Sequence, residues 1–207
     1  MGKVEEILSV LEEMYPNAEC ELLHNNGFEL LIAVMLSAQS TDKSVNLLTR
    51  NLFQKYKTPE DYATADIKEL EQDLRRIGLY KNKAKNVKSM AQMLIDHYNG
   101  TVPSSQVELE KLPGVGRKTA NVVLSVWFHV PRIAVDTHVD RVSKRLKLAF
   151  KSDSVLKVEE KLMRKIPKNK WSDTHHKMIF FGRYHCTSRN PKCEGCKLKH
   201  QCRYPNI

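Results

Sequence analysis

The sequence predicts an all-α protein, and three observations lead to this prediction. Apolar residues recur three and four positions apart in segment after segment, which is the spacing of one helix face. These segments are separated by Pro and Gly breaks, or by Ser, Thr and Asp residues of the kind that cap helices. No segment shows the convincing alternation of apolar and polar residues that indicates a strand.

Six helices are predicted before residue 100. The first carries apolar residues from Val4 to Met14 and is stopped by Pro16. The second follows an Asn-Gly turn and is apolar enough to be buried. The second helix is expected at residues 28–36, and the third runs from Thr41 or Asp42 to Tyr56. The fourth starts at 58–61 with Pro59 in its first turn. The fifth runs from Asp66 to Gly78, and the sixth covers 81–98 before Gly100.

The second half continues this pattern on both sides of a glycine-rich turn. A short helix that starts at Ser104 or Ser105 leads into Pro-Gly-Val-Gly (113–116), and a buried helix follows to about Phe128. Pro131 then breaks the chain. Three further helices are expected behind aspartate caps: Thr137–Lys147 after Asp136, residues 155–166 after Asp153, and one from Asp173 to Tyr184.

The helices are expected to form two domains. One, residues 22–132, would be inserted into the other, which consists of residues 1–21 and 133–207. The distribution of charge fits this division. Residues 1–30 hold seven glutamates and one basic residue, a net charge of −6, which leaves +16 on the remainder. An acidic N-terminal helix would be attracted to a basic C-terminal half.

The composition restricts the class of partner and the compartment. A net charge of +10 favours an anionic partner, and a surplus of this size suits a polyanion better than a small acidic metabolite. A merely soluble basic protein would show the same balance. No window has the roughly 18 apolar residues of a membrane span, and the N-terminus lacks a signal-peptide pattern. We therefore expect a cytoplasmic protein with no membrane partner.

Four of the five cysteines lie within the last 22 residues, separated by six, two and five residues: Cys186, Cys193, Cys196 and Cys202. Four thiolates this close can enclose a zinc ion or a [4Fe–4S] cluster, and the spacing does not choose between them. A reducing compartment disfavours disulfides, and the distant Cys20 is interpreted as a packed or free thiol. The same loop carries Arg189 and Lys192, which a structural metal site would present to DNA.

The glycine-rich turn is a candidate anion site. Gly114 and Gly116 can adopt positive φ and leave the backbone uncovered by side chains. Successive N–H groups at the start of the next helix can then bind a phosphate, beside Arg117 and Lys118. Taken alone, the turn is equally compatible with an ordinary connection between helices, with Lys118 on a solvated face.

Long motifs in the right order show which family the sequence resembles. They are MLSAQSTD (35–42), IGLYKNKAKN (77–86), LPGVGRKTANVV (112–123), AVDTHVDRV (134–142), the run 175–186 and the C-x6-C-x2-C-x5-C ending. With these motifs, nearly the whole chain resembles the endonuclease III family of iron–sulfur DNA glycosylases. The resemblance implies two helical domains flanking a DNA-binding cleft, a helix-hairpin-helix motif at about 104–125, and a [4Fe–4S] cluster held by the four cysteines in the loop 186–202.

The resemblance also implies roles for single residues. Lys118 would be the nucleophile and Asp136 the essential carboxylate, although Asp136 also reads as a plain helix cap. Gln39 and Leu79 would fill the gap left by a flipped nucleotide; without the family they read as a polar loop residue and a core leucine. Further DNA contacts are expected at Leu112, Gly114, Gly116, His138, Arg189 and Lys192, and His138 reads almost equally well as a structural histidine.

Basic residues around the sixth helix are expected to contact phosphates. These are Arg75, Arg76 and the lysines at positions 81, 83, 85 and 88. A solvated helix face is the alternative for at least half of them.

The implied function is base-excision DNA repair. A monomer would bind double-stranded DNA with a damaged base or an abasic site and would remove oxidised or ring-saturated pyrimidines. A lysine Schiff base would then allow cleavage 3′ to the abasic site by β-elimination. One alternative is a monofunctional adenine-mismatch glycosylase, although that type lacks lysine at the position of Lys118. The other is a helix-hairpin-helix module that binds DNA without chemistry.

Overall fold

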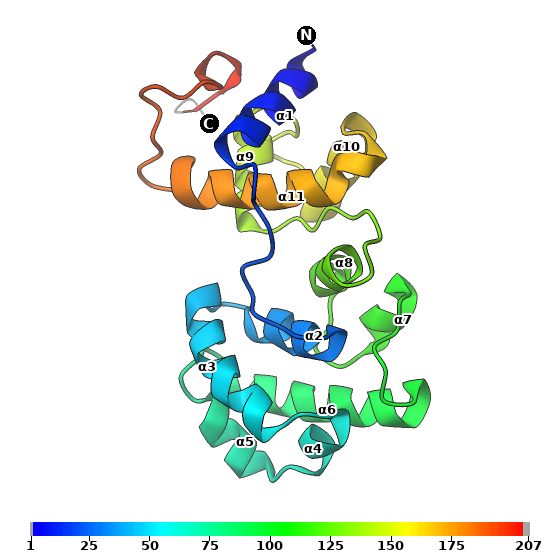
Figure 1. Cartoon of the computed structure of the whole chain (residues 1–207). Helices are drawn as coiled ribbons and strands as arrows, with labels where there is room; N and C mark the ends of the chain where they lie inside the picture. The colour runs from blue at the N-terminus through cyan, green and yellow to red at the C-terminus, as the bar shows by residue number, and fades with distance from the viewer. Residues whose placement is uncertain (1, 205–207) are drawn as a thin grey trace. The chain divides into compact units, whose positions relative to one another are not determined.

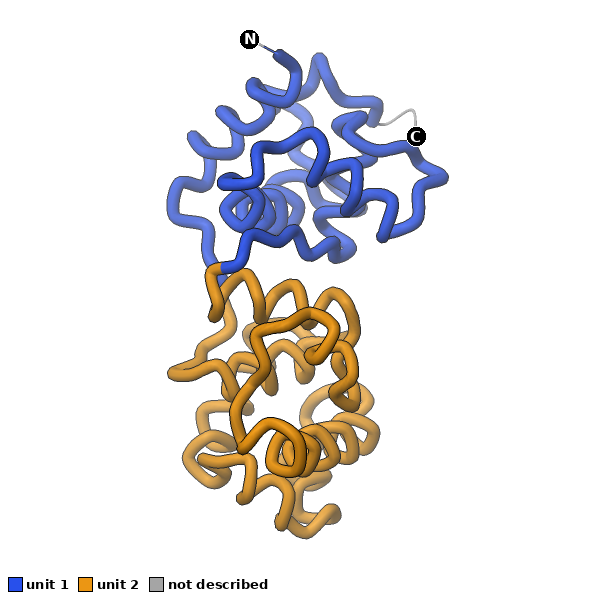
Figure 2. The backbone as a smooth tube through the Cα atoms, turned by 90° about the vertical axis from the view of Figure 1, so that its right-hand side faces the viewer, with its two compact units in different colours: residues 1–20, 130–207 blue, residues 21–129 orange. Residues whose placement is uncertain are grey.

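The computed structural model describes residues 2–204, and every regular element in this range is helical (Figure 1). The predicted fold class is therefore confirmed. The chain forms two compact units: unit 1 is Met1–Cys20 with Val130–Ile207, and unit 2 is Glu21–His129 (Figure 2). These limits differ from the expected insertion at 22–132 by at most three residues. Within residues 2–204, no helix combines the length and the apolar character needed to cross a membrane.

Unit 2 is built around the long helix α6. Its helices are α2 (Gly27–Leu36), α3 (Asp42–Lys55), α4 (Pro59–Thr64), α5 (Ile67–Leu74), α6 (Tyr80–Tyr98), α7 (Gln106–Lys111) and α8 (Arg117–Val126). Helices α4, α5 and α2 pack on α6, and α2 also packs on α3 and α8. Every residue of α2 is buried, and its one charged residue, Glu29, accepts hydrogen bonds from the backbone and the side chain of Asn25.

The helix starts in unit 2 follow the sequence closely. Thr41, Thr58 and Asp66 accept hydrogen bonds from the first backbone N–H groups of α3, α4 and α5, so these predicted caps are confirmed. One predicted end is wrong. Helix α5 stops at Leu74 instead of continuing to Gly78, because Arg75 begins a turn that leads to α6.

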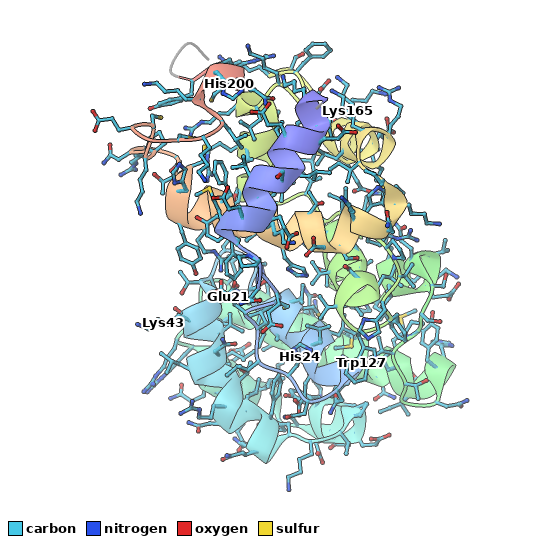
Figure 3. The ribbon with its side chains drawn as sticks, turned by 45° about the horizontal axis from the view of Figure 1, so that its top comes forward. Glu21, His24, Lys43, Trp127, Lys165 and His200 are labelled. Carbon is cyan, nitrogen blue, oxygen red and sulfur yellow. The ribbon has the colours of Figure 1, made fainter. Side chains whose placement is uncertain are left out.

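The ends of unit 2 meet at a tryptophan. Trp127 follows α8, and its indole lies so close to Gly27 that a Cβ on this glycine would be 2.6 Å from Nε1. His24 precedes α2 and packs edge-on against the same indole, with 6.4 Å between ring centroids; Figure 3 labels both side chains. Because only a hydrogen fits between the backbone of α2 and the indole, Gly27 allows these two chain segments to close on one another.

Unit 1 combines the N-terminal helix with the C-terminal third of the chain. Its elements are α1 (Lys3–Met14), α9 (Thr137–Arg145), α10 (Val155–Lys165), the 3-10 turn η1 (Lys168–Lys170), α11 (Trp171–Phe180), the π-helical turn η2 (Phe181–His185) and the 3-10 turn η3 (Lys199–Gln201). Its core is formed by apolar residues from α1, α9, α10 and α11, among them Leu11, Val142 and Met178. The long gap between α1 and α9 in sequence is therefore closed by burial of one shared core.

Charge pairs join α1 to the C-terminal part of unit 1. Glu12 pairs with the buried Lys177 of α11, and Glu13 pairs with Lys197. His200, labelled in Figure 3, lies 2.9 Å from a carboxylate oxygen of Glu6. The acidic character of the N-terminal helix thus stabilises unit 1, because Glu12 and Glu13 pair with lysines of the same unit.

Three predicted helix limits in unit 1 are wrong by a few residues. Ser154, not Asp153, caps α10; the Asp153 carboxylate instead accepts the N–H of Phe150 and pairs with Lys161. Helix α11 begins before Asp173, which therefore lies in its first turn. Helix α9 ends at Arg145 rather than Lys147, because Lys147 adopts a positive φ of 59°.

Candidate active site

The glycine-rich turn joins two short helices of unit 2 into a hairpin. Helix α7 ends at Lys111 and α8 begins at Arg117. The turn is held from within, because the side chains of Leu109, Leu112 and Val115 are buried and the N–H of Val115 donates to the carbonyl of Leu112 at 3.0 Å. With only 2% of Leu112 exposed, its expected contact with DNA is restricted to backbone atoms.

The two glycines of the turn differ in backbone conformation and in the space around them. Gly114 has a φ of +78°, and a Cβ on it would lie 2.9 Å from Cβ of Asn86 and 3.0 Å from Cε of Met35. Gly116 has a φ of −97°, which any residue can adopt, so the freedom of glycine to adopt positive φ is used at Gly114 and not at Gly116. Nothing lies within 4 Å of a Cβ on Gly116. Its exposed backbone instead leaves open space in front of the first N–H groups of α8.

This difference gives a prediction for stability. We expect Gly114→Ala to lower the free energy of unfolding by about 1–3 kcal/mol, because alanine is strained at positive φ and its methyl group meets Asn86. We expect Gly116→Ala to cost under about 1 kcal/mol. Urea unfolding of both variants measures this, and a larger loss for Gly116→Ala would contradict the account.

Lys118 lies in the first turn of α8, and its side chain is exposed. The helix begins here because Gly116 supplies an extended N-cap, whose carbonyl accepts the N–H of Ala120 at 3.0 Å. The buried face of α8, including Ala120 and Val123, fixes the helix so that Lys118 stands on the opposite face. The amine is thus presented at the positive end of a helix dipole, next to exposed backbone donors.

Asp136 is the N-cap of α9 in unit 1, while Lys118 belongs to unit 2. One oxygen of its carboxylate, Oδ1, accepts the backbone N–H groups of His138 at 2.9 Å and Val139 at 2.8 Å. Neither bond uses Oδ2. The cap interpretation is therefore confirmed, and the cap fixes the orientation of a carboxylate that still has a second oxygen to offer.

His138 is held inside unit 1. Its Nδ1 lies 3.2 Å from Nη2 of Arg141, and because a guanidinium can only donate, Nδ1 must accept. Arg141 also donates to the carbonyls of Gly182 at 2.7 Å and Cys186 at 3.1 Å. Burial lowers the pKa of His138, which favours the neutral imidazole. These contacts favour the structural interpretation of this histidine.

Gln39 and Leu79 are neighbours in unit 2, although 40 positions separate them in the sequence. Both adopt positive φ, 54° and 60°, which is unusual for residues with a side chain. Both side chains are exposed, Leu79 at 52%, so the interpretation of Leu79 as a core leucine is wrong. A Cβ on Gly78 would lie 3.5 Å from the carbonyl oxygen of Gln39, so the two loops lie side by side.

The basic face expected on α6 is smaller than predicted. Lys81 and Lys85 are exposed, as a phosphate contact requires. Lys88 instead donates to the carbonyls of Ala63 at 2.5 Å and Ala65 at 2.7 Å, where it caps the end of α4. Lys83 is only 6% exposed. The burial of Lys83 and the backbone bonds of Lys88 therefore disfavour the predicted phosphate contacts of these two lysines, because a lysine side chain is exposed only where its helix face is unpacked.

The C-terminal cysteines gather around one pocket of about 510 Å³ in unit 1. Cys186, Cys193, Cys196 and Cys202 all line it, together with Arg189 and Lys192, both of which are exposed at its edge. None of the described cysteines forms a disulfide. Between residues 2 and 204, no three His, Cys, Asp or Glu side chains are close enough to hold a single metal ion.

Polar donors point at the sulfur atoms of Cys186 and Cys202. Arg145, buried in α9, donates to Sγ of Cys186 at 3.3 Å and to the carbonyl of Thr187 at 2.7 Å. The N–H of Tyr204 lies 3.4 Å from Sγ of Cys202, and the Tyr204 ring covers the Arg145 guanidinium at 4.2 Å. Burial raises the pKa of the Cys186 thiol, and the charge of Arg145 opposes this. The cysteine spacing contained no signal for Arg145, because its contact depends on how α9 packs.

Comparison with known proteins identifies the class to which this all-helical chain belongs. Residues 32–168 match the family model of the HhH-GPD superfamily base excision DNA repair proteins. Endonuclease III of Bacillus subtilis (strain 168) is 59% identical, over 98% of this chain and 93% of the relative. Endonuclease III of Rickettsia prowazekii (strain Madrid E) is 46% identical, over 99% and 94%.

A solved structure gives the same result. It is a trapped covalent intermediate of an endonuclease III with DNA, in an estranged-adenine complex. Its TM-score is 0.94 at 59% identity, over 98% of this chain and 96% of that one. The chain therefore belongs to the endonuclease III family of the HhH-GPD superfamily.

Proposed function

We propose that this protein is a DNA glycosylase and abasic-site lyase that acts on double-stranded DNA with a damaged base. The observation that carries the proposal is the exposed Lys118 at the start of α8, behind a hairpin whose backbone is open to an anion. The family membership supports it, since a relative at 59% identity has been trapped covalently on DNA. Oxidised or ring-saturated pyrimidines are the proposed substrates.

The hairpin would hold DNA through its backbone. Exposed N–H groups near Gly114 and Gly116 suit a phosphate, a contact that positions DNA without reading its sequence. The formal charge of +10, together with Lys81 and Lys85 on α6, adds attraction that does not depend on sequence. Such a grip lets the enzyme bind wherever damage occurs, so that selectivity rests on extrusion of the damaged nucleotide.

Lys118 is the proposed nucleophile. Its neutral amine attacks C1′ of the flipped nucleotide, the bond from C1′ to the base breaks, and the base leaves with the bonding electron pair. The nitrogen then loses a proton, the bond from C1′ to the ring oxygen breaks, and that oxygen leaves with the electron pair and takes up a proton, which gives the Schiff base as an iminium. The iminium acidifies the proton on C2′, and loss of that proton expels the 3′ phosphate by β-elimination.

Asp136 is the proposed partner of that amine. Its Oδ1 is engaged by the cap bonds, so Oδ2 is the oxygen available to assist deprotonation of Lys118 and to stabilise the cationic sugar of the transition state. Because the two residues belong to different units, this role requires both units to bind the same DNA.

The four C-terminal cysteines are proposed to hold a [4Fe–4S] cluster. Their free thiols line a single pocket, and the N–H donors of Arg145 and Tyr204 suit sulfur that carries negative charge. When bound, the cluster would tie the ends of loop 186–202 together, which makes its contribution structural. Arg189 and Lys192 at the pocket edge would then be presented to DNA in a fixed position.

The cluster assignment predicts a coloured protein. We expect purified protein to be brown, with broad visible absorption that disappears when iron is removed. We expect Cys202→Ala to lose this absorption and to unfold at a lower denaturant concentration, because loop 186–202 loses an anchor. Iron analysis and the visible spectrum measure this, with Cys20→Ala as the matched control. A colourless preparation that contains zinc instead of iron would contradict the assignment.

The function is tested by trapping. Protein is incubated with duplex DNA that contains one abasic site, in the presence of borohydride, which reduces a Schiff base to a stable bond. A covalent adduct is expected on this duplex and none on undamaged DNA. No adduct, combined with base removal, would instead indicate a monofunctional glycosylase; binding with neither reaction would indicate a non-catalytic module. A panel of duplexes with single lesions then defines the substrates.

A further inference from the structure

One face of α6 contacts the proposed DNA-binding elements of unit 2. Leu79 stands at the start of the helix, and Lys83 and Asn86 follow after four and three residues, so all three share a face. Lys83 reaches the Gln39 loop, and Asn86 packs against Gly114 of the hairpin. The helix thus connects Leu79, Gln39 and the hairpin, three elements that are far apart in the sequence.

Lys83 makes the connection to the Gln39 loop. Its side chain is buried, and Nζ donates to Oγ of Ser40 at 3.1 Å. Ser40 follows Gln39 directly, and its N–H donates to the carbonyl of Ser37 at 3.0 Å, which closes the turn after α2. On the other side, the carbonyl oxygen of Gln39 lies beside Gly78, where a Cβ would be in ordinary van der Waals contact with it at 3.5 Å. The Gln39 loop is therefore bonded to a side chain of α6 and lies against the turn that precedes α6.

The burial of this ammonium group needs an explanation. Desolvation lowers the pKa of Lys83, which means that carrying a charge here costs free energy. A leucine or methionine would fill the same space without that cost. A phosphate contact does not explain the charge, because the side chain is covered by protein. What the ammonium supplies is a strong, directed hydrogen bond to the Ser40 hydroxyl.

We propose that Lys83 is a positioning residue that locks the Gln39 loop to the start of α6, so that Gln39 and Leu79 enter the duplex as one rigid wedge. The proposal rests on the proposed function, which supplies the gap-filling role of these two residues. A loop left free would have to be ordered during nucleotide extrusion, and small misplacements of groups that orient a substrate can cost up to about a hundred-fold in rate.

The consequence differs between substrates. An abasic sugar in a duplex must be extruded, and the gap it leaves must be filled. An abasic sugar in single-stranded DNA needs neither step. Loss of the Lys83 bond should therefore slow strand cleavage in the duplex and leave cleavage of the single strand nearly unchanged, whereas damage to the active site would slow both.

The test compares Lys83→Met with Lys81→Met. Methionine keeps the length of the buried stem and removes the ammonium, and Lys81 is an exposed lysine of the same helix. Single-turnover cleavage of an abasic site is measured in a duplex and in a single strand. We expect Lys83→Met to lose roughly ten-fold or more in the duplex and under about two-fold in the single strand. We expect Lys83→Arg, which keeps a cationic donor, to recover part of the loss.

The salt dependence of duplex binding separates the two lysines. Lys81→Met should make the negative slope of log K against log salt shallower by about 0.9, the value for one lost phosphate contact. Lys83→Met should leave the slope unchanged. A lower slope for Lys83→Met, equal losses on both substrates, or wild-type rates on both would each overturn the proposal.

Hydrogen exchange tests the lock without any reaction. Lys83→Met should speed up exchange at the amides of residues 38–41, while amides in the middle of α6 keep their protection. Unchanged exchange in that loop would overturn the proposal, whatever the enzyme does. If wild-type protein forms no adduct with abasic DNA, the proposed function fails, and the exchange result still decides whether Lys83 locks the loop.

Discussion

Replacing Lys118 by glutamine is expected to abolish the covalent adduct with abasic DNA and to reduce strand cleavage at least about a thousand-fold. Glutamine keeps a polar side chain of similar length, but its amide nitrogen has no basic lone pair to attack C1′. The fold should be preserved, because Lys118 is exposed and makes no contact that α8 needs. Borohydride trapping followed by a denaturing gel measures the adduct, and binding to a duplex shows that DNA recognition survives.

The hairpin itself offers a matched control. Lys111 is an exposed lysine at the end of α7, and it pairs with Glu108 at 2.8 Å. Lys111→Gln removes the same charge from the same motif without removing the proposed nucleophile. Wild-type adduct formation is expected for this variant. An adduct at the wild-type level in Lys118→Gln would show that another amine carries the reaction.

Replacing Asp136 by asparagine is expected to slow base removal and strand cleavage about a hundred- to a thousand-fold while the protein stays folded. Asparagine is as good an N-cap as aspartate, so its side-chain oxygen can still accept the N–H groups of His138 and Val139. The negative charge that would assist Lys118 is lost. Single-turnover rates and urea unfolding of the same preparation measure the two effects separately.

Asp136→Ala completes the comparison. Alanine removes the charge and the cap together, so the free energy of unfolding should fall by about 1 kcal/mol relative to the asparagine variant. Both variants should be equally slow in catalysis if charge is the contribution that matters. Near wild-type rates for Asp136→Asn would mean that this residue acts only as the cap of α9.

The local features of this fold could be predicted from the sequence. Thr41, Thr58, Asp66 and Asp136 all cap helices, because a cap depends on backbone groups two or three residues away. The apolar run of α2 indicated a buried helix, and all of it is buried. The errors in helix limits lie at helix ends, where a neighbouring group can take the expected role, as at Asp153, whose carboxylate accepts the N–H of Phe150 and pairs with Lys161 while Ser154 caps α10.

The exposure and contacts of individual side chains could not be predicted. Lysines 81, 83, 85 and 88 look alike in sequence, yet two are exposed, one is buried beneath the Gln39 loop, and one caps α4. A lysine has a long apolar stem, so its position depends on which helix face packs. Leu79 differs from its sequence-based interpretation in the opposite way. A leucine that the pattern placed in the core is exposed, at a position of positive φ just before α6.

The fold class, the helix starts and the residue types of the candidate site follow from local spacing and motifs, so they could be read before the chain is folded. The proximity of Gln39 and Leu79, the bond from Lys83 to Ser40 and the support of the cysteine pocket by Arg145 are visible only in the folded protein. These contacts join residues about 40 positions apart. Packing of whole helices brings such residues together, and no local pattern records it.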